Sequence, residues 1–181
     1  GVDDLELNWD EFPTKINSDL IGKVINIASR TSGFIHKKFN GKLACELDDK
    51  DIIATMLKAK DTIIQHYADR QYNLATNKIM QLADKANQYI ANKEPWKQIK
   101  DPKMHEQVHQ VCTTSLNMFK IIITYLAPIL PETAKNSMSF LNINILDWQE
   151  IVNILLDHEI KPYKHLLARV DQKDIPANNI S

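Results

Sequence analysis

The first apolar stripe along the chain repeats at helical spacing. It predicts one long helix over residues 9–39, with Asn8 and Glu11 as the two members of a capping box at its start and Asn40-Gly41 at its end. The apolar positions that define its buried face are 16, 20, 24, 27, 34 and 35. Such a one-sided stripe is typical of a helix that packs against a larger core.

Further stripes of the same period predict the rest of the fold. In order, we expect helices over residues 49–70, 72–92, 95–100, 101–126, 131–141 and 147–157. Leu74 and Ile79 are among the residues expected to be buried in the second of these. Short connections between long amphipathic helices indicate antiparallel neighbours. The predicted fold class is therefore all-α, an antiparallel helix bundle.

Composition agrees with one helical domain. The chain has 181 residues, of which 44% are hydrophobic and only four are glycine, and strand-like runs are nearly absent. We expect one domain over residues 1–171 and a C-terminal tail or linker over 172–181. Because the chain starts without methionine and ends in the polar run DIPANNIS, we expect it to be part of a longer protein.

Charge, hydropathy and cysteine content narrow the classes of function. The net charge is −1, so any nucleic-acid site must be local. The longest apolar run, IIITYLAPIL, is interrupted by Pro128, so we expect a soluble protein with no membrane partner. Cys45 and Cys112 are too few and too far apart for a disulfide scaffold or a thiolate zinc site. This cysteine usage favours a reducing, cytoplasmic location.

The most conspicuous motif is HEQVH, from His105 to His109. Two histidines one helical turn apart, with a glutamate between them, can bind zinc and activate a water molecule. A catalytic zinc needs a third protein ligand, and the later glycine and histidine of the extended motif are absent. His105, His109 and Cys112 instead continue the apolar stripe of their helix. We therefore expect no metal site, and interpret both histidines as packing or hydrogen-bonding residues.

A polar strip runs beside the apolar face of the first helix. At about 100° per residue, one narrow sector holds Lys23, Asn26, Arg30, Gly33 and Lys37. Asparagine and arginine can bond to base edges, and lysine can neutralise phosphates. A solvated helix face has the same composition, so the residues alone leave both interpretations open.

Trp96 is the second candidate for nucleic-acid binding. It follows Pro95 at the start of a short predicted helix, and lysines flank it at positions 93, 97, 100 and 103. Unpaired bases stack on exposed aromatic side chains set among cations. A half-buried core tryptophan is the competing interpretation.

Three segments resemble a known family. NSDLIGKVINIASRTSGFIHKKFNGKL, YNLATNKIMQLADKANQYIANKEPW and NMFKIIITYLAPILPETAKNSMSFL are similar, in this order, to the anticodon-binding domain of bacterial methionyl-tRNA synthetase. The resemblance runs from about Leu5 to Asp171. It implies a helix bundle of the class I synthetase anticodon-binding type, and the anticodon loop of tRNA(Met) as the partner.

The resemblance also implies roles for particular residues. The family's asparagine and arginine on the first helix correspond to Asn26 and Arg30, and its proline and tryptophan to Pro95 and Trp96. Trp96 would stack on the first anticodon base, a cytosine, while Asn26 and Arg30 would contact its edge and surroundings. Gly22 stands where some relatives carry a polar residue, which puts a contact from that position in doubt.

The family's catalytic machinery is not found in this sequence. There is no HIGH-type or KMSKS-type signature, no phosphate-binding glycine loop and no nucleophile elbow. The resemblance implies that the parent enzyme joins methionine to tRNA(Met) with ATP and magnesium in a catalytic domain of the same chain. It also implies that KPYKHLLARVD packs toward that domain. We expect this fragment to need no cofactor and to bind tRNA without catalysis. A helical protein-interaction module without RNA binding is the alternative.

Overall fold

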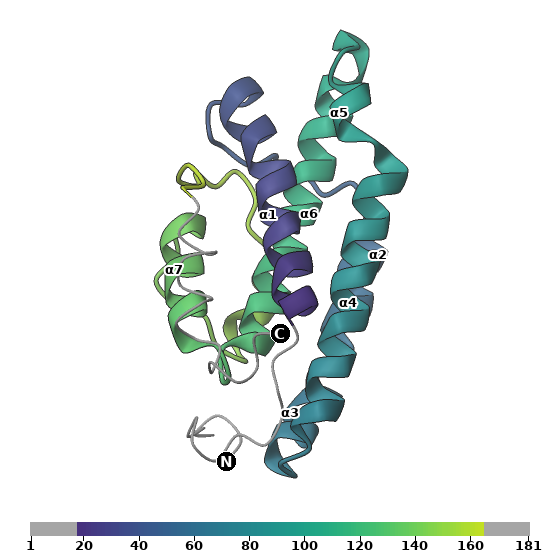
Figure 1. The fold of residues 1–181 in the computed structure, drawn as a ribbon. Helices are drawn as coiled ribbons and strands as arrows, with labels where there is room; N and C mark the ends of the chain where they lie inside the picture. Colours follow the sequence, from purple (N-terminus) through teal and green to yellow (C-terminus); the bar gives the residue numbers. More distant parts are fainter. Residues whose placement is uncertain (1–17, 165–181) are drawn as a thin grey trace.

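The computed structural model describes residues 18–164, which form a helix bundle (Figure 1). Its elements are α1 (Ser18–Lys38), α2 (Lys50–Leu57), α3 (Lys60–Ala68), α4 (Tyr72–Lys93), α5 (Pro95–Gln98), the 3₁₀ helix η3 (Pro102–Met104), α6 (His105–Leu126), α7 (Pro131–Leu141) and the 3₁₀ helix η4 (Glu150–Val152). Between residues 18 and 164 there is no strand, only an isolated bridge that joins Lys42 to Glu159. The all-α prediction is confirmed. The predicted cap at Asn8 and Glu11 lies outside the described residues, as does most of KPYKHLLARVD.

The central helix of the bundle is α6. Every residue from 111 to 126 is buried, and α1, α2, α4, α5 and α7 all pack against it. Both α1 and α4 run antiparallel to α6, and therefore parallel to each other (Figure 1). Cys112 is fully buried in this helix, which raises the pKa of its thiol to about 12. No helix within the described part of the chain is long and apolar enough to span a membrane.

The end of α1 lies where the sequence places it. Asn40 and Gly41 have φ values of 56° and 76°, the left-handed conformation that often follows a helix. A Cβ atom on Gly41 would lie 3.0 Å from the ring of His36. Glycine is therefore favoured here by both the backbone conformation and the close approach of that ring.

Residues 49–70 form two helices rather than the one predicted. Between α2 and α3 the Ala59 amide donates to the carbonyl of Met56, only three residues earlier, at 3.2 Å. The Tyr125 hydroxyl of α6 donates to the same carbonyl at 2.7 Å. The prediction of one helix was wrong because the Met56 carbonyl, which would bond to the amide four residues later in a continuous α-helix, accepts from Tyr125 and Ala59 instead.

The predicted helix over 147–157 is also wrong, because only η4 is helical there. Lys120 of α6 is 3% exposed, and its Nζ donates to the carbonyl of Glu150 at 2.9 Å and to that of Asn153 at 2.5 Å. The side chain of Asn117 exchanges two hydrogen bonds with the backbone of Leu155. The backbone groups of this segment are thus satisfied by α6 instead of by a helix of their own.

The predicted helix over 72–92 is confirmed by α4, but its buried face differs at the start. Leu74 is 46% exposed, whereas Tyr72, Ala75 and Ile79 are buried. The Tyr72 ring lies 6.4 Å from that of Tyr67 in α3, which packs against α4. The prediction for Leu74 was wrong because this contact turns the neighbouring positions of α4 toward the core.

The two histidines of HEQVH bond to backbone carbonyls of different segments. The Nε2 atom of His105 lies 2.9 Å from the Ile99 carbonyl, and that of His109 lies 2.7 Å from the Lys42 carbonyl. The ring of His109 also stacks on Phe39, with centroids 3.9 Å apart. Their prediction as packing or hydrogen-bonding residues is confirmed. Among the described residues, no group of His, Cys, Asp and Glu side chains is arranged to hold a metal ion.

Candidate nucleic-acid interface

The polar strip of α1 lies along a seam with α4 and α5. Lys23 forms an ion pair with Asp84 of α4 at 2.6 Å. One turn further along α1, the Asn26 Nδ2 atom donates to Asn87 Oδ1 of α4 at 3.2 Å. One turn beyond that, Arg30 reaches Trp96 of α5. The structure therefore brings two candidate groups together that are far apart in the sequence.

The contact between Arg30 and Trp96 is a cation–π interaction. The guanidinium carbon of Arg30 lies 4.8 Å from the centroid of the indole ring. The Trp96 side chain is 41% exposed, so part of the ring is accessible to solvent and the rest is covered by neighbouring residues. Trp96 therefore lies at the surface and is not part of the buried core, while its role in RNA binding stays a prediction. An exposed aromatic ring with a cation beside it is a suitable surface for an unpaired base.

The backbone around Pro95 fixes the direction of Trp96. Glu94 ends α4 in the left-handed conformation, with φ 48° and ψ 56°, and Pro95 follows as the first residue of α5. Proline at this position already has the φ angle that a helix needs, and its missing N–H is not required there. Pro95 is buried, whereas the next side chain, that of Trp96, lies at the surface.

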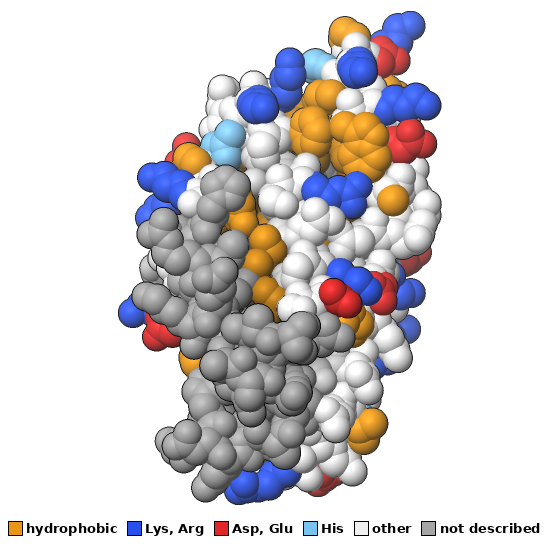
Figure 2. Space-filling model, viewed as in Figure 1, with side chains coloured by type: hydrophobic (Ala, Val, Ile, Leu, Met, Phe, Trp, Pro, Cys, Tyr) orange, Lys and Arg blue, Asp and Glu red, His pale blue; other side chains and the backbone are white. Residues whose placement is uncertain are grey.

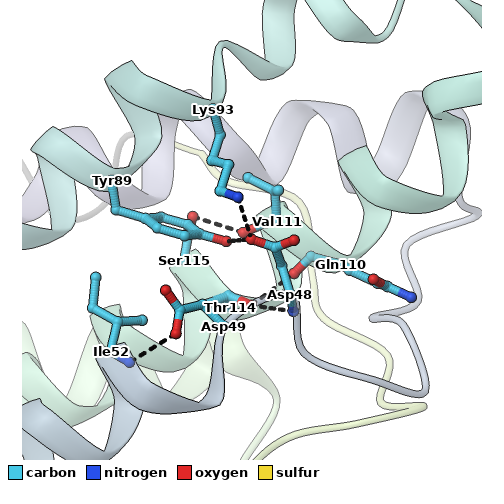
Figure 3. A network of polar contacts seen from close by, with 9 residues as sticks. All are labelled: Asp48, Asp49, Ile52, Tyr89, Lys93, Gln110, Val111, Thr114 and Ser115. Carbon is cyan, nitrogen blue, oxygen red and sulfur yellow. Dashed lines mark hydrogen bonds and ion pairs between the residues drawn. The ribbon is translucent and has the colours of Figure 1, made fainter.

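A polar network fixes the C-terminal part of α4 to its neighbours, and α5 follows directly after this part of the chain (Figure 3). The Asp48 carboxylate accepts a hydrogen bond from the Tyr89 hydroxyl at 2.7 Å and lies 3.1 Å from Lys93 Nζ. The amide of Asp48 donates to Thr114 of α6 at 2.9 Å. Burial, followed by the bond to Asp48, raises the pKa of Tyr89. The neutral phenol is therefore the form that donates to Asp48, and it anchors α4 beside the candidate interface.

The remaining candidates are not gathered at Trp96. Lys37 is exposed and lines a separate hollow with His36, Pro162 and Tyr163. Figure 2 shows apolar side chains among Lys and Arg side chains at the end of the molecule where α5 lies. Of the lysines near Trp96 in sequence, Lys93 pairs with Asp48 and Lys97 lies 3.6 Å from Glu94. The positive charge around Trp96 is thus partly neutralised.

Sequence reasoning missed two residues of this seam, Asp84 and Asn87. Both flank the buried alanines 83 and 86 of α4, at the edge of its apolar face. A polar pair three residues apart at such an edge indicates that the helix meets a polar partner. Without the position of α1, however, that partner could not be assigned.

Comparison with known proteins identifies the family. Residues 41–170 match the model of the anticodon-binding domain of methionyl tRNA ligase. The chain belongs to this family. The matched residues include Pro95 and Trp96, whereas Asn26 and Arg30 precede them.

Individual relatives agree with the family match. The chain is 46% identical over 176 residues to a methionine–tRNA ligase of Thiobacillus denitrificans, with 97% of this chain covered. That alignment spans only 26% of the relative, so the chain corresponds to about a quarter of the longer protein.

Solved structures of the same fold come from Mycobacterium tuberculosis methionyl-tRNA synthetase. The ligand-free form matches with a TM-score of 0.70 and 19% identity, over 81% of this chain and 31% of that one. The complex with methionyl-adenylate matches with a TM-score of 0.70 and 20% identity, over 82% and 31%. At this identity the likeness establishes the fold alone.

Proposed function

We propose that this anticodon-binding domain recognises the anticodon loop of tRNA(Met) through Trp96, Arg30 and Asn26. The observation that carries the proposal is the contact of the Arg30 guanidinium with the exposed indole of Trp96. The first anticodon base, cytosine, stacks on the indole, and Asn26 and Arg30 contact its edge. Pro95 starts the short helix that carries the indole. Lys23 and Lys37 of α1 contribute positive charge toward the phosphates of the loop, although Lys23 also pairs with Asp84 and Lys37 lies apart from Trp96.

Arg30 leaves the indole ring when the base arrives. An exposed cation–π contact stabilises by about 0.5 to 1 kcal/mol, whereas stacking of a base on an aromatic side chain contributes about 1 to 3 kcal/mol. The exchange is therefore favourable, and the released guanidinium, which carries five donors, turns to the base edge or a neighbouring phosphate. Arg30 thus covers the indole in the free domain and contacts RNA in the complex.

The chemistry of the parent protein lies outside this chain. We infer that the longer protein attaches methionine to tRNA(Met) and uses ATP with magnesium in its catalytic part. This domain supplies recognition, and we assign catalysis and the cofactor to the rest of the longer protein. We place the protein in the cytoplasm, where free thiols such as Cys45 and Cys112 remain reduced.

The test is a titration of this chain with synthetic anticodon stem-loop RNAs at low salt. The wild type is expected to bind a loop with the CAU triplet more tightly than one with a scrambled triplet, with an affinity that falls as salt rises. Trp96→Ala is expected to weaken CAU binding by about 1 to 3 kcal/mol, and Trp96→Phe by less.

Leu74→Ala is the matched control, because Leu74 is a similarly exposed apolar residue at the other end of α4, 46% against 41%. It is expected to bind like the wild type. Absence of triplet-dependent binding by the wild type would refute the proposal and favour a helical protein-interaction module.

A further inference from the structure

The orientation of the Asn26 amide is set by a chain of hydrogen bonds that begins at two backbone carbonyls. The Asn87 Nδ2 atom donates to the carbonyl of Lys23 at 3.0 Å and to that of Ala83 at 3.1 Å. A carbonyl can only accept, so the nitrogen of the Asn87 amide must face these two atoms. Both of its hydrogens are then used.

This arrangement fixes the next link. With its nitrogen turned to the carbonyls, Asn87 presents Oδ1 to Asn26, and an oxygen can bond only to the nitrogen of the Asn26 amide. The observed bond, from Asn26 Nδ2 to Asn87 Oδ1 at 3.2 Å, has this direction. The Oδ1 atom of Asn26 therefore faces away from Asn87. Asn26 is exposed, so its outward edge is accessible to a ligand.

We propose that Asn87 is a positioning residue that makes Asn26 selective for a base with an amino donor. The outward edge of Asn26 offers the oxygen acceptor and the second N–H donor, which complements the amino group and the N3 acceptor of cytosine. In the same position of the base, uracil presents a carbonyl and an N–H in those places, so it would require the flipped amide. Asn87 prevents that flip. The inference rests on the proposed function, since Asn26 must meet the base edge.

The position of Asn87 supports a role in orientation beyond simple packing. It is half-buried in α4 and spans the seam, because its amide bonds to the backbone of α1, to its own helix and to the side chain of Asn26. A residue needed only for packing could be apolar, as the neighbouring buried Ala83 and Ala86 are. The Asn87 amide instead connects two backbone carbonyls, those of Lys23 and Ala83, to the exposed side chain of Asn26.

Two substitutions separate orientation from packing. Asn87→Leu has a similar volume but no oxygen to accept from Asn26, so the Asn26 amide becomes free to flip. Asn87→Asp cannot donate to the two carbonyls, yet its carboxylate still accepts from Asn26 Nδ2 and retains the orientation. Both should lower stability, whereas only Asn87→Leu should alter base preference.

The experiment measures the dissociation constants of this chain for stem-loops with CAU and UAU triplets. The ratio of the two constants is expected to fall roughly ten-fold in Asn87→Leu, as for one lost hydrogen bond of about 1.4 kcal/mol. It should stay near the wild-type ratio in Asn87→Asp, although the added negative charge weakens binding to both RNAs. In an Asn26→Ala background, Asn87→Leu should change the ratio no further.

Gln88→Leu is the matched control, since Gln88 lies next to Asn87 but is exposed and bonds to Asn92 of its own helix. It should leave the ratio unchanged. If Asn87→Leu does not give the wild-type circular-dichroism spectrum, Asn87→Ala replaces it, since it also lacks the acceptor.

An unchanged ratio in a folded Asn87→Leu or Asn87→Ala variant would overturn the role of Asn87 while leaving anticodon recognition in place. Equal loss of preference in Asn87→Asp and Asn87→Leu would also overturn it, because a purely structural role predicts that result. If the wild type fails to distinguish CAU from UAU, the proposed recognition of the first base fails as well.

Discussion

Removing the hydroxyl of Tyr67 tests how α3 is joined to the end of α6. Tyr67 is fully buried and donates to the carbonyl of Tyr125 at 2.7 Å. That carbonyl is in the last turn of α6, where the helix provides no further amide. Residue 128 is a proline without N–H, and the amide of Ile129 donates to Leu126. Among the described residues, the Tyr67 hydroxyl is thus the donor that satisfies it.

Tyr125→Phe is the matched comparison. Its hydroxyl donates to the Met56 carbonyl at the same 2.7 Å, but that carbonyl also accepts from the Ala59 amide at 3.2 Å. Tyr125→Phe therefore removes one of two bonds, with an expected cost of about 1 kcal/mol. Tyr67→Phe leaves a buried carbonyl without a donor, with an expected cost of about 2 kcal/mol, near the middle of the range for such groups.

Urea denaturation followed by circular dichroism measures both differences, and the slope of the transition should stay constant. In thermal melts, Tyr67→Phe should lower Tm by about 4 to 8 °C. Anticodon stem-loop binding should be unaffected, because the pair is remote from Trp96. A Tyr67→Phe variant that is no less stable than Tyr125→Phe would refute the reasoning that the second donor protects the Met56 carbonyl.

Three further predictions concern pH and the histidine motif. Burial raises the pKa of Tyr67, so above about pH 10 the unfolded chain loses the proton of this hydroxyl while the folded chain keeps it. The free energy of unfolding of the wild type should therefore fall above about pH 10, and it should fall less steeply in Tyr67→Phe. Urea melts at a series of pH values would show the difference. Burial lowers the pKa of Lys120, so between that lowered pKa and about 10.5 the unfolded state binds more protons. The stability of the wild type relative to Lys120→Met should therefore rise with pH in this window, and a constant difference would contradict the stated burial effect. His109→Ala should lower the free energy of unfolding by about 2 kcal/mol, because it removes the bond to the Lys42 carbonyl and the stacking on Phe39. Added zinc should leave the melting temperature of the wild type unchanged. Tight one-to-one zinc binding that this substitution abolished would restore the metal-site interpretation.

The sequence determined the helical class, most of the long helices and the groups available for recognition. Apolar spacing placed α1, α4, α6 and α7, because each has a face that must be buried and a period that only a helix satisfies. Pro95 and the Asn40-Gly41 pair marked a helix start and a helix end, because their effect on the backbone is local. Trp96, Arg30 and Asn26 were candidates from residue type and spacing alone.

Tertiary structure decided which of these groups meet and where local patterns fail. The Tyr125 hydroxyl bonds to the end of α2, and Lys120 bonds to the carbonyls of residues 150 and 153, where only the short η4 is helical. The contact between Tyr72 and Tyr67 leaves Leu74 exposed to solvent. Arg30 lies over Trp96 only because α1 and α4 run parallel against α6. Partners such as Asn87 become visible only when the chain has folded, since a hydrogen bond between residues 61 positions apart leaves no periodic signal in the sequence.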